Sequence, residues 1–174
     1  MKKIIAIDMD EVLADVTPKL LNLYEAEFGY RPKETDYQGR KIYETPEAYK
    51  LRDNLHNKGF FRDLPVMENS QAVVKELHER YTIYIITAST EFKYSMLDKH
   101  EWLQEHFPFI SWKNYIFCGR KSFLKADYLI DDKASNLIPF EGKGLLYSAA
   151  HNVYEDRFTR VNNWLEVKAF FESL

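Results

Sequence analysis

Two pairs of acidic side chains stand directly after short apolar runs of the sequence. Asp8 and Asp10 follow the run Ile4–Ile7. Asp131 and Asp132 follow a second such run farther along the chain. Either pair alone is explained by a turn or a helix cap, where Asp is common. Two pairs that each end an apolar strand are harder to explain in this way. Carboxylate oxygens brought together at one site favour a hard cation such as Mg²⁺.

Side chains that suit a phosphate group occur between these acidic pairs. Thr87 and Ser89 end a further apolar run, and their hydroxyls and backbone N–H groups could bind phosphate oxygens. Lys121, ten residues before Asp131, could neutralise phosphate charge. Each has an ordinary alternative, because the Thr87 segment could cap a helix and an isolated lysine is usually a surface residue.

The elements that must position these side chains are short apolar strands that alternate with helices. The predicted strands are Ile4–Ile7, Thr82–Ile86, Tyr115–Cys118, Tyr128–Ile130 and Leu145–Tyr147. Such strands lack polar alternation, which predicts a parallel sheet in an α/β fold. Ligands of these sheets bind at the carboxyl ends of the strands, where the acidic pairs and the Thr87 segment fall.

Helix-start and helix-stop residues divide the remaining segments. Thr17 as N-cap, with Pro18 in the first turn, predicts a helix that ends at Gly29. Further helices are predicted from Thr45 to Gly59, from Asn69 or Ser70 onward, over Glu91–Phe107 and over Asn163–Leu174. They supply the helical part of the predicted fold.

One spacing is too long for a simple α/β unit. The first strand ends near Asp8 and the next begins near Tyr81, whereas a βαβ unit needs about 30 residues. Residues 16–68 are therefore predicted to form a small helical insertion. Residues 1–15 and 69–174 are predicted to form the α/β core.

Length and composition bound the class of protein. The 174 residues suit one domain with a small insertion, and a net charge of −3 gives no basic field for bulk nucleic-acid binding. Cys118 is the only cysteine, so a disulfide framework and a thiolate zinc site are excluded. The first apolar run is shorter than a signal peptide needs, and no stretch is long enough to span a membrane. These features predict a cytoplasmic protein.

The order of the motifs resembles that of the haloacid dehalogenase (HAD) superfamily of aspartate-nucleophile phosphatases. Three segments are similar to the 5'(3')-deoxyribonucleotidase family, namely DMDEVLAD at 8–15, GFFRDL at 59–64 and LIDDK at 129–133. The resemblance extends over most of the chain, from the first predicted strand to the fifth. It implies a Rossmann-like core with a parallel sheet, and a helical cap formed by the insertion.

The resemblance also implies a covalent mechanism. Asp8 would be the nucleophile that forms an aspartyl-phosphate, and Asp10 would protonate the leaving alcohol and then activate water. Mg²⁺ would lie between the Asp8 side chain, the Asp10 backbone carbonyl and the last acidic pair. Of that pair, Asp132 is favoured as the direct ligand, with Asp131 holding metal-bound water or Lys121.

The family motifs imply further contacts to the substrate. Thr87, Ser89 and Lys121 would bind the phosphate group. Phe60 and Phe61 match an aromatic motif where the cap returns to the core, and one of them could stack on a nucleobase or both could be ordinary core residues.

One position departs from the superfamily pattern. Glu11 stands where the superfamily often has a small residue, commonly Gly. Its carboxyl group could shape the leaving-group side of the site or simply face solvent, and the sequence leaves both readings open.

The function that the resemblance implies is Mg²⁺-dependent hydrolysis of deoxyribonucleoside 5'- or 3'-monophosphates. An acid at Asp10 favours a phosphatase over the dehalogenases of the superfamily. The alternatives are a phosphatase of sugar phosphates or other small phosphomonoesters, and a nucleotide-binding module without turnover. The expected partner is a small-molecule nucleotide rather than a nucleic-acid polymer or a membrane, and aromatic residues on the cap would permit a homodimer.

Overall fold

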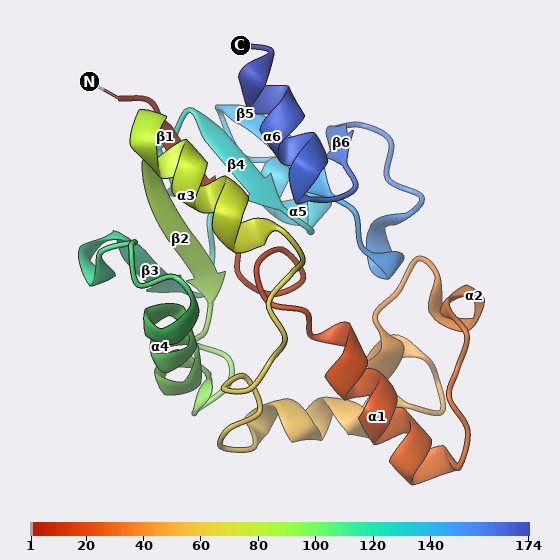
Figure 1. The fold of residues 1–174 in the computed structure, drawn as a ribbon. Coiled ribbons are helices and arrows are strands. Elements are labelled where there is room, and N and C mark those ends of the chain that lie inside the picture. Colours follow the sequence, from red (N-terminus) through yellow and green to blue (C-terminus); the bar gives the residue numbers. More distant parts are fainter. Residues whose placement is uncertain (1) are drawn as a thin grey trace.

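The computed structural model describes residues 2–174 and is built on one six-stranded sheet (Figure 1). Every neighbouring pair of strands is parallel, in the order β3-β2-β1-β4-β5-β6. The strands are β1 (Ile4–Ile7), β2 (Thr82–Ala88), β3 (Tyr115–Cys118), β4 (Tyr128–Asp131), β5 (Lys143–Tyr147) and β6 (Thr159–Val161). The predicted parallel α/β sheet is therefore confirmed.

Strand β1 lies at the centre of the sheet and sets the position of the site. Ile7 pairs with Ile85 of β2 on one side and with Ile130 of β4 on the other. Because the strands are parallel, the residues that follow Ile7 and Ile130 emerge side by side at the same edge. That edge is where Asp8 and Asp131 lie.

Helices cover the two faces of the sheet. They are α3 (Ser70–Arg80), α4 (Ser95–His106), α5 (Ala134–Leu137) and α6 (Trp164–Glu172). Helices α3 and α6 lie beside each other across one face (Figure 1). The Phe171 ring packs 5.2 Å from Tyr81 and 5.0 Å from Tyr128 between ring centroids, so aromatic contacts join α6 to this face.

The segment between β1 and α3 lies beyond the carboxyl ends of the strands, toward the bottom right of Figure 1. We call residues 16–68 the insertion. It contains α1 (Thr17–Phe28), α2 (Glu34–Tyr37), and the 3₁₀ helices η1 (Ile42–Glu44) and η2 (Tyr49–His56). The two connections to the core run side by side, since Asp15 N donates to Pro65 O and Met67 N donates to Leu13 O, both at 2.8 Å. The insertion is thereby held over the sheet edge that bears Asp8.

Several predicted helix limits differ from the structure. Helix α1 ends at Gly29 in the left-handed conformation as expected, but its N-cap is Val16 rather than Thr17. The Thr17 hydroxyl instead donates to the Glu11 carboxyl group. The segment from Thr45 to Gly59 contains a 3₁₀ helix rather than an α-helix, and α4 begins at Ser95 instead of Glu91.

One strand was missing from the prediction. Strand β6 has three residues, of which only Val161 is buried, so it lacks the uniform apolar run that identified the other strands. It is the edge strand beside β5, so only one of its two edges pairs with another strand of the sheet.

Within residues 2–174, no helix is both long enough and apolar enough to cross a bilayer.

Candidate active site

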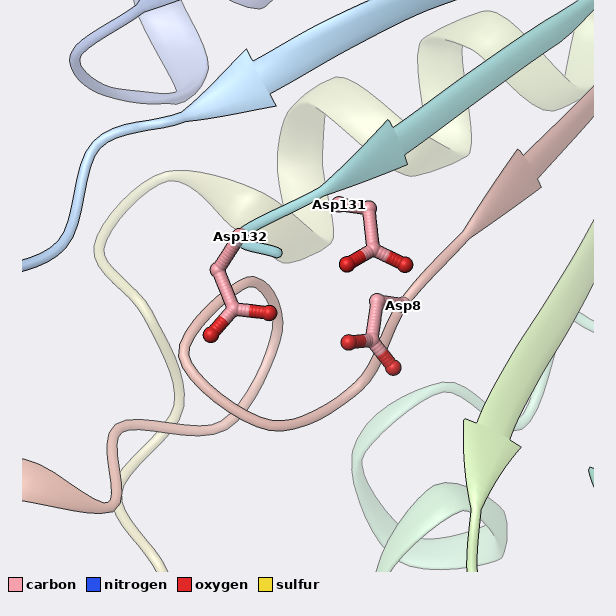
Figure 2. Close-up of side chains that lie close together, drawn as sticks. All are labelled: Asp8, Asp131 and Asp132. Carbon is pink, nitrogen blue, oxygen red and sulfur yellow. The ribbon is translucent and has the colours of Figure 1, made fainter. Parts of the chain in front are cut away.

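Three carboxylates from two neighbouring strands meet at the sheet edge. Asp8 follows β1, Asp131 is the last residue of β4, and Asp132 comes directly after it. One oxygen of each lies within 4.8 Å of the others, and all three side chains are buried (Figure 2). The structure thus brings together three of the four acidic residues that the sequence singled out, whereas the Asp10 carboxylate contacts Lys99 instead.

Lys121 bridges two of these carboxylates. Its Nζ lies 2.7 Å from Asp8 Oδ1 and 2.6 Å from Asp131 Oδ2. Burial alone would lower the pKa of this lysine, but the two carboxylates outweigh burial and raise it, so Lys121 stays charged. The other oxygen of Asp131 accepts hydrogen bonds from Lys133 N and Asn136 Nδ2. Protein donors therefore occupy both oxygens of Asp131.

Asp132 is bonded differently. Neither of its carboxylate oxygens has a well-aligned hydrogen-bond donor, although His151 Nε2 lies 3.1 Å from Oδ2. Lys41, which comes from the insertion, places its Nζ 3.8 Å from the same oxygen. Burial raises the pKa of Asp132, but Lys41 and His151 outweigh burial and hold it below its ordinary value. Asp132 is thus ionised and has oxygens free to bind.

The balance of charge at this edge fits a bound cation. Burial raises the pKa of Asp8 to about 8, Lys121 opposes the shift, and Asp131 and Asp132 add to it. Asp8 and Asp131 share the single ammonium group of Lys121, and the Asp132 oxygens lack aligned donors. An all-oxygen donor set with spare negative charge is typical of sites for hard divalent cations.

A buried lysine that the sequence analysis overlooked holds Asp10. Lys99 of α4 has no exposed surface, and its Nζ lies 2.7 Å from Asp10 Oδ2. The same Nζ donates to Thr87 Oγ1 at 3.0 Å and to Ala88 O at 2.9 Å. Because Thr87 accepts from Lys99, its own hydroxyl hydrogen is left to donate elsewhere.

Unpartnered polar atoms concentrate at this edge. Among residues 2–174, seven buried side-chain nitrogen and oxygen atoms have no hydrogen-bond partner. Four of them are Asp10 Oδ1, Ser89 Oγ and both oxygens of Asp132. Buried polar groups are normally paired, so a cluster of unpaired ones marks a place where a ligand completes the bonding.

A cavity of about 350 Å³ opens between the sheet edge and the insertion. Its wall includes Asp10 and Glu11 from the core, and Tyr37, Lys41, Tyr43 and Phe61 from the insertion. The volume suits a small molecule with a ring system.

The two adjacent phenylalanines have different surroundings. Phe61 lines the cavity, and its ring lies 4.6 Å from Lys99 Nζ. Phe60 does not line the cavity, because its ring is turned toward α1, where Lys19 Nζ lies 5.0 Å from the ring centroid. Phe60 is a packing residue of the insertion.

A repeating pattern in the sequence could have revealed Lys99. The buried residues of α4 are Ser95, Asp98, Lys99, Trp102 and Leu103, a spacing typical of the packed face of a helix. Two charged residues on that face require partners inside the protein. The Asp98 carboxylate accepts hydrogen bonds from Gly59 N at 2.9 Å and from Phe61 N at 3.4 Å. These bonds hold the last part of the insertion, where the chain returns to the core, against α4.

Two other residues of the site gave no signal in the sequence. Lys41 lies in a polar stretch of the insertion, and His151 lies in the short 3₁₀ helix η4 (Ala150–Asn152) after β5. Both meet Asp132 only through the folding of distant segments.

Glu11 is buried and its backbone has an unusual conformation. Its φ is 61°, a left-handed value, and the residue is 8% exposed. Burial raises the pKa of the Glu11 carboxyl group to about 8, while Lys41 and the hydrogen bond from Thr17 oppose the shift. The reading in which Glu11 faces solvent is therefore wrong.

Known proteins resemble this chain in sequence and in fold. A protein of Staphylococcus epidermidis is 46% identical over 172 residues, covering 98% of this chain and 96% of its own. The 5'(3')-deoxyribonucleotidase of Bacillus subtilis strain 168 is 41% identical over 174 residues, covering 97% and 98%. A HAD family hydrolase of Deinococcus radiodurans, solved with bound phosphate and sodium, matches with a TM-score of 0.64 at 15% identity, covering 99% and 96%.

A family model fits nearly the whole sequence. It is described as "5' nucleotidase, deoxy (Pyrimidine), cytosolic type C protein" and matches residues 2–172. Its span includes both acidic pairs, Lys121 and the whole insertion. The chain therefore belongs to the cytosolic type C family of 5' deoxynucleotidases.

Proposed function

We propose that this protein hydrolyses deoxyribonucleoside 5'- or 3'-monophosphates to nucleoside and phosphate with the help of Mg²⁺. The observation that carries the proposal is the placement of Asp8 and Asp10 just after β1, with Asp10 in the wall of the cavity. Asp8 is held by Lys121, and Asp10 keeps one unpartnered oxygen. The family and the named activity of the Bacillus subtilis relative support the choice of substrate.

Asp8 acts as the nucleophile in the first step. Its Oδ1 is held at 2.7 Å by both Met9 N and Lys121 Nζ, which leaves Oδ2 to attack phosphorus. The bond from phosphorus to the ester oxygen breaks as the aspartyl-phosphate forms. Asp10 Oδ1 gives its proton to the departing oxygen, so the nucleoside leaves as a neutral alcohol.

Asp10 reverses its role in the second step. Its carboxylate takes a proton from water, and the water oxygen attacks phosphorus and releases phosphate from Asp8. Lys99 Nζ, at 2.7 Å from Asp10 Oδ2, fixes the carboxylate with Oδ1 left free. Lys99 is therefore a positioning residue for the proton transfers.

The remaining polar groups suit the phosphoryl oxygens. The Thr87 hydroxyl accepts from Lys99 and so has its hydrogen to donate, and Ser89 Oγ has no protein partner. Lys121 balances the negative charge of the phosphoryl group as it passes to Asp8. These three residues form the proposed phosphate site.

Mg²⁺ would be held by the Asp8 side chain, the Asp10 backbone carbonyl and Asp132. The free oxygens of Asp132 favour it as the direct ligand, because protein donors already occupy both oxygens of Asp131. When bound, the ion supplies positive charge beside the phosphoryl oxygens.

The cavity would receive the nucleoside. Phe61 forms part of the cavity wall against which a base could pack, and Tyr37 and Tyr43 add aromatic surface on the insertion side. We also propose that the protein works in the cytoplasm, and the word cytosolic in the description of its family supports this proposal. A homodimer through the exposed Tyr30 and Tyr49 of the insertion stays a prediction that size-exclusion chromatography tests.

Phosphate release from a panel of substrates tests the proposed function. The panel contains dUMP, dTMP, 3'-dUMP, UMP, dAMP, a sugar phosphate and an aryl phosphate, each with Mg²⁺ and with EDTA. We expect release to depend on Mg²⁺, to be fastest with deoxynucleotides and to be abolished in Asp8→Asn. The exposed Asp156→Asn loses the same charge and should keep full activity.

Three outcomes would contradict the proposal in different ways. Preference for the sugar phosphate would make this a phosphatase with another substrate. Nucleotide binding without phosphate release would make it a binding module. Substantial activity of Asp8→Asn would remove the covalent mechanism.

A further inference from the structure

The backbone at Glu11 is strained in a way that a glycine would avoid. Its φ of 61° lies in the left-handed region, which residues with a Cβ rarely adopt and which glycine adopts freely. The side chain also gives up most of its contact with water. Strain combined with a buried carboxyl group points to a function for that group.

The protein leaves this carboxyl group short of hydrogen-bond donors. Thr17 Oγ1 lies 3.2 Å from Oε1 and 3.2 Å from Oε2. A hydroxyl has one hydrogen and can satisfy only one of these oxygens at a time. The other oxygen therefore has room for a further partner.

That partner can reach Glu11 from the cavity. Glu11 is part of the cavity wall, next to Asp10 on the core side and together with Tyr37 and Lys41 of the insertion. A phosphate ester with phosphorus at Asp8 has its leaving oxygen at Asp10. The groups directly beyond that oxygen are those of the sugar, and they enter the cavity beside Glu11.

A sugar hydroxyl is the substrate group that fits best. A hydroxyl can both donate and accept, so it pairs with a carboxyl group in either protonation state. The base is attached beyond the sugar ring and so lies farther from the leaving oxygen. A deoxyribonucleoside monophosphate has one free hydroxyl on its sugar, at the 3' or the 5' position opposite the phosphate.

We propose that Glu11 determines specificity by hydrogen bonding the free sugar hydroxyl of the substrate. This inference rests on the proposed function, because it takes the substrate to be a deoxynucleotide. On this proposal, the conformational strain of Glu11 in the left-handed region is retained because its carboxyl group recognises the sugar. This role also accounts for the presence of a large acid where the superfamily often has glycine.

Two substrates that differ by one hydroxyl test the proposal. They are dTMP and 3'-deoxythymidine 5'-monophosphate, and the quantity measured is the ratio of their kcat/KM values. We expect the wild type to favour dTMP about tenfold, the effect of one hydrogen bond. In Glu11→Gly the ratio should fall close to one, and in Glu11→Gln it should be intermediate because the amide oxygen still accepts.

The variants include a check on folding and a matched control. Glycine suits the backbone at position 11, so Glu11→Gly should unfold no earlier than the wild type, and Glu11→Gln keeps the size of the side chain. Glu25→Gln removes an exposed carboxylate from α1 and should leave the ratio and the activity unchanged.

Each result decides between the claims. The role of Glu11 is overturned if the wild type shows a kcat/KM ratio close to one, or if both Glu11 variants keep the wild-type ratio. Phosphate release from dTMP in the same experiments would still uphold the proposed function. If the folded wild type releases phosphate from neither nucleotide, both claims fall.

Discussion

At the scale of single residues, the site depends on buried charges that hold one another in place. Lys121 is shared by Asp8 and Asp131, and Lys99 is shared by Asp10, Thr87 and a backbone carbonyl. Each lysine satisfies one oxygen of a reacting carboxylate and leaves the other free. This division lets Asp8 and Asp10 do different chemistry two residues apart.

Replacing Lys99 tests how much of the proton transfer depends on positioning. In Lys99→Met, Asp10 loses its ammonium partner and its carboxylate is free to rotate. We expect kcat to fall about 100-fold, in the range of general acid–base catalysis, with a small change in KM. Unfolding should become easier by roughly 2 kcal/mol, less than for a fully buried pair because a quarter of the Asp10 side chain is exposed.

Steady-state kinetics on dTMP and urea unfolding measure the two effects. Lys99→Arg keeps the charge and should recover part of kcat. An unchanged kcat in a folded Lys99→Met protein would show that Asp10 needs no such partner.

At the scale of elements, helix α4 joins the insertion to the site. Two neighbouring charged residues on its packed face contact different parts of the protein. Asp98 accepts from the backbone at Gly59 and Phe61, while Lys99 contacts Asp10. The segment that closes the insertion and the acid of the site are thus held by one helix.

Removing Asp98 tests this connection. Asp98→Ala leaves the N–H groups of Gly59 and Phe61 without their acceptor, which should lower the free energy of unfolding by about 1–3 kcal/mol. Because Phe61 lines the cavity, KM for dTMP should rise more than kcat falls. Asp98→Asn keeps an acceptor oxygen and should lose less of both.

Urea unfolding and kinetics on dTMP provide the measurements. Equal stability of Asp98→Ala and the wild type would contradict the connection. So would a loss confined to kcat.

At the scale of the whole molecule, the sequence predicts the sheet better than it predicts the cavity. Uniform apolar runs identify five of the strands, and acidic pairs at strand ends meet because parallel strands share an edge. Strand β6 is not predicted from the sequence because only Val161 of its three residues is buried. Local sequence patterns are enough to predict an element whose residues are all buried in the same way.

The wall of the cavity depends on contacts between distant segments. Phe60 and Phe61 are adjacent and equally apolar, yet only Phe61 faces the cavity, because the turn of the insertion sends Phe60 toward α1. His151 has no metal-ligand spacing in the sequence, yet the 3₁₀ helix η4 after β5 brings it to Asp132. Such positions follow from the tertiary fold rather than from residue type.

The central claim is that Asp8 becomes covalently phosphorylated. It is tested most directly by rapid-quench mass spectrometry of Asp10→Asn mixed with 4-nitrophenyl phosphate and Mg²⁺. The nitrophenolate leaves without a proton, so the first step should proceed, whereas the second step lacks its base and should stall. We predict a phosphoryl group on the peptide that contains Asp8, absent when Asp8 is also replaced by Asn. Release of nitrophenolate with no phosphoryl group on that peptide at any quench time would contradict the claim.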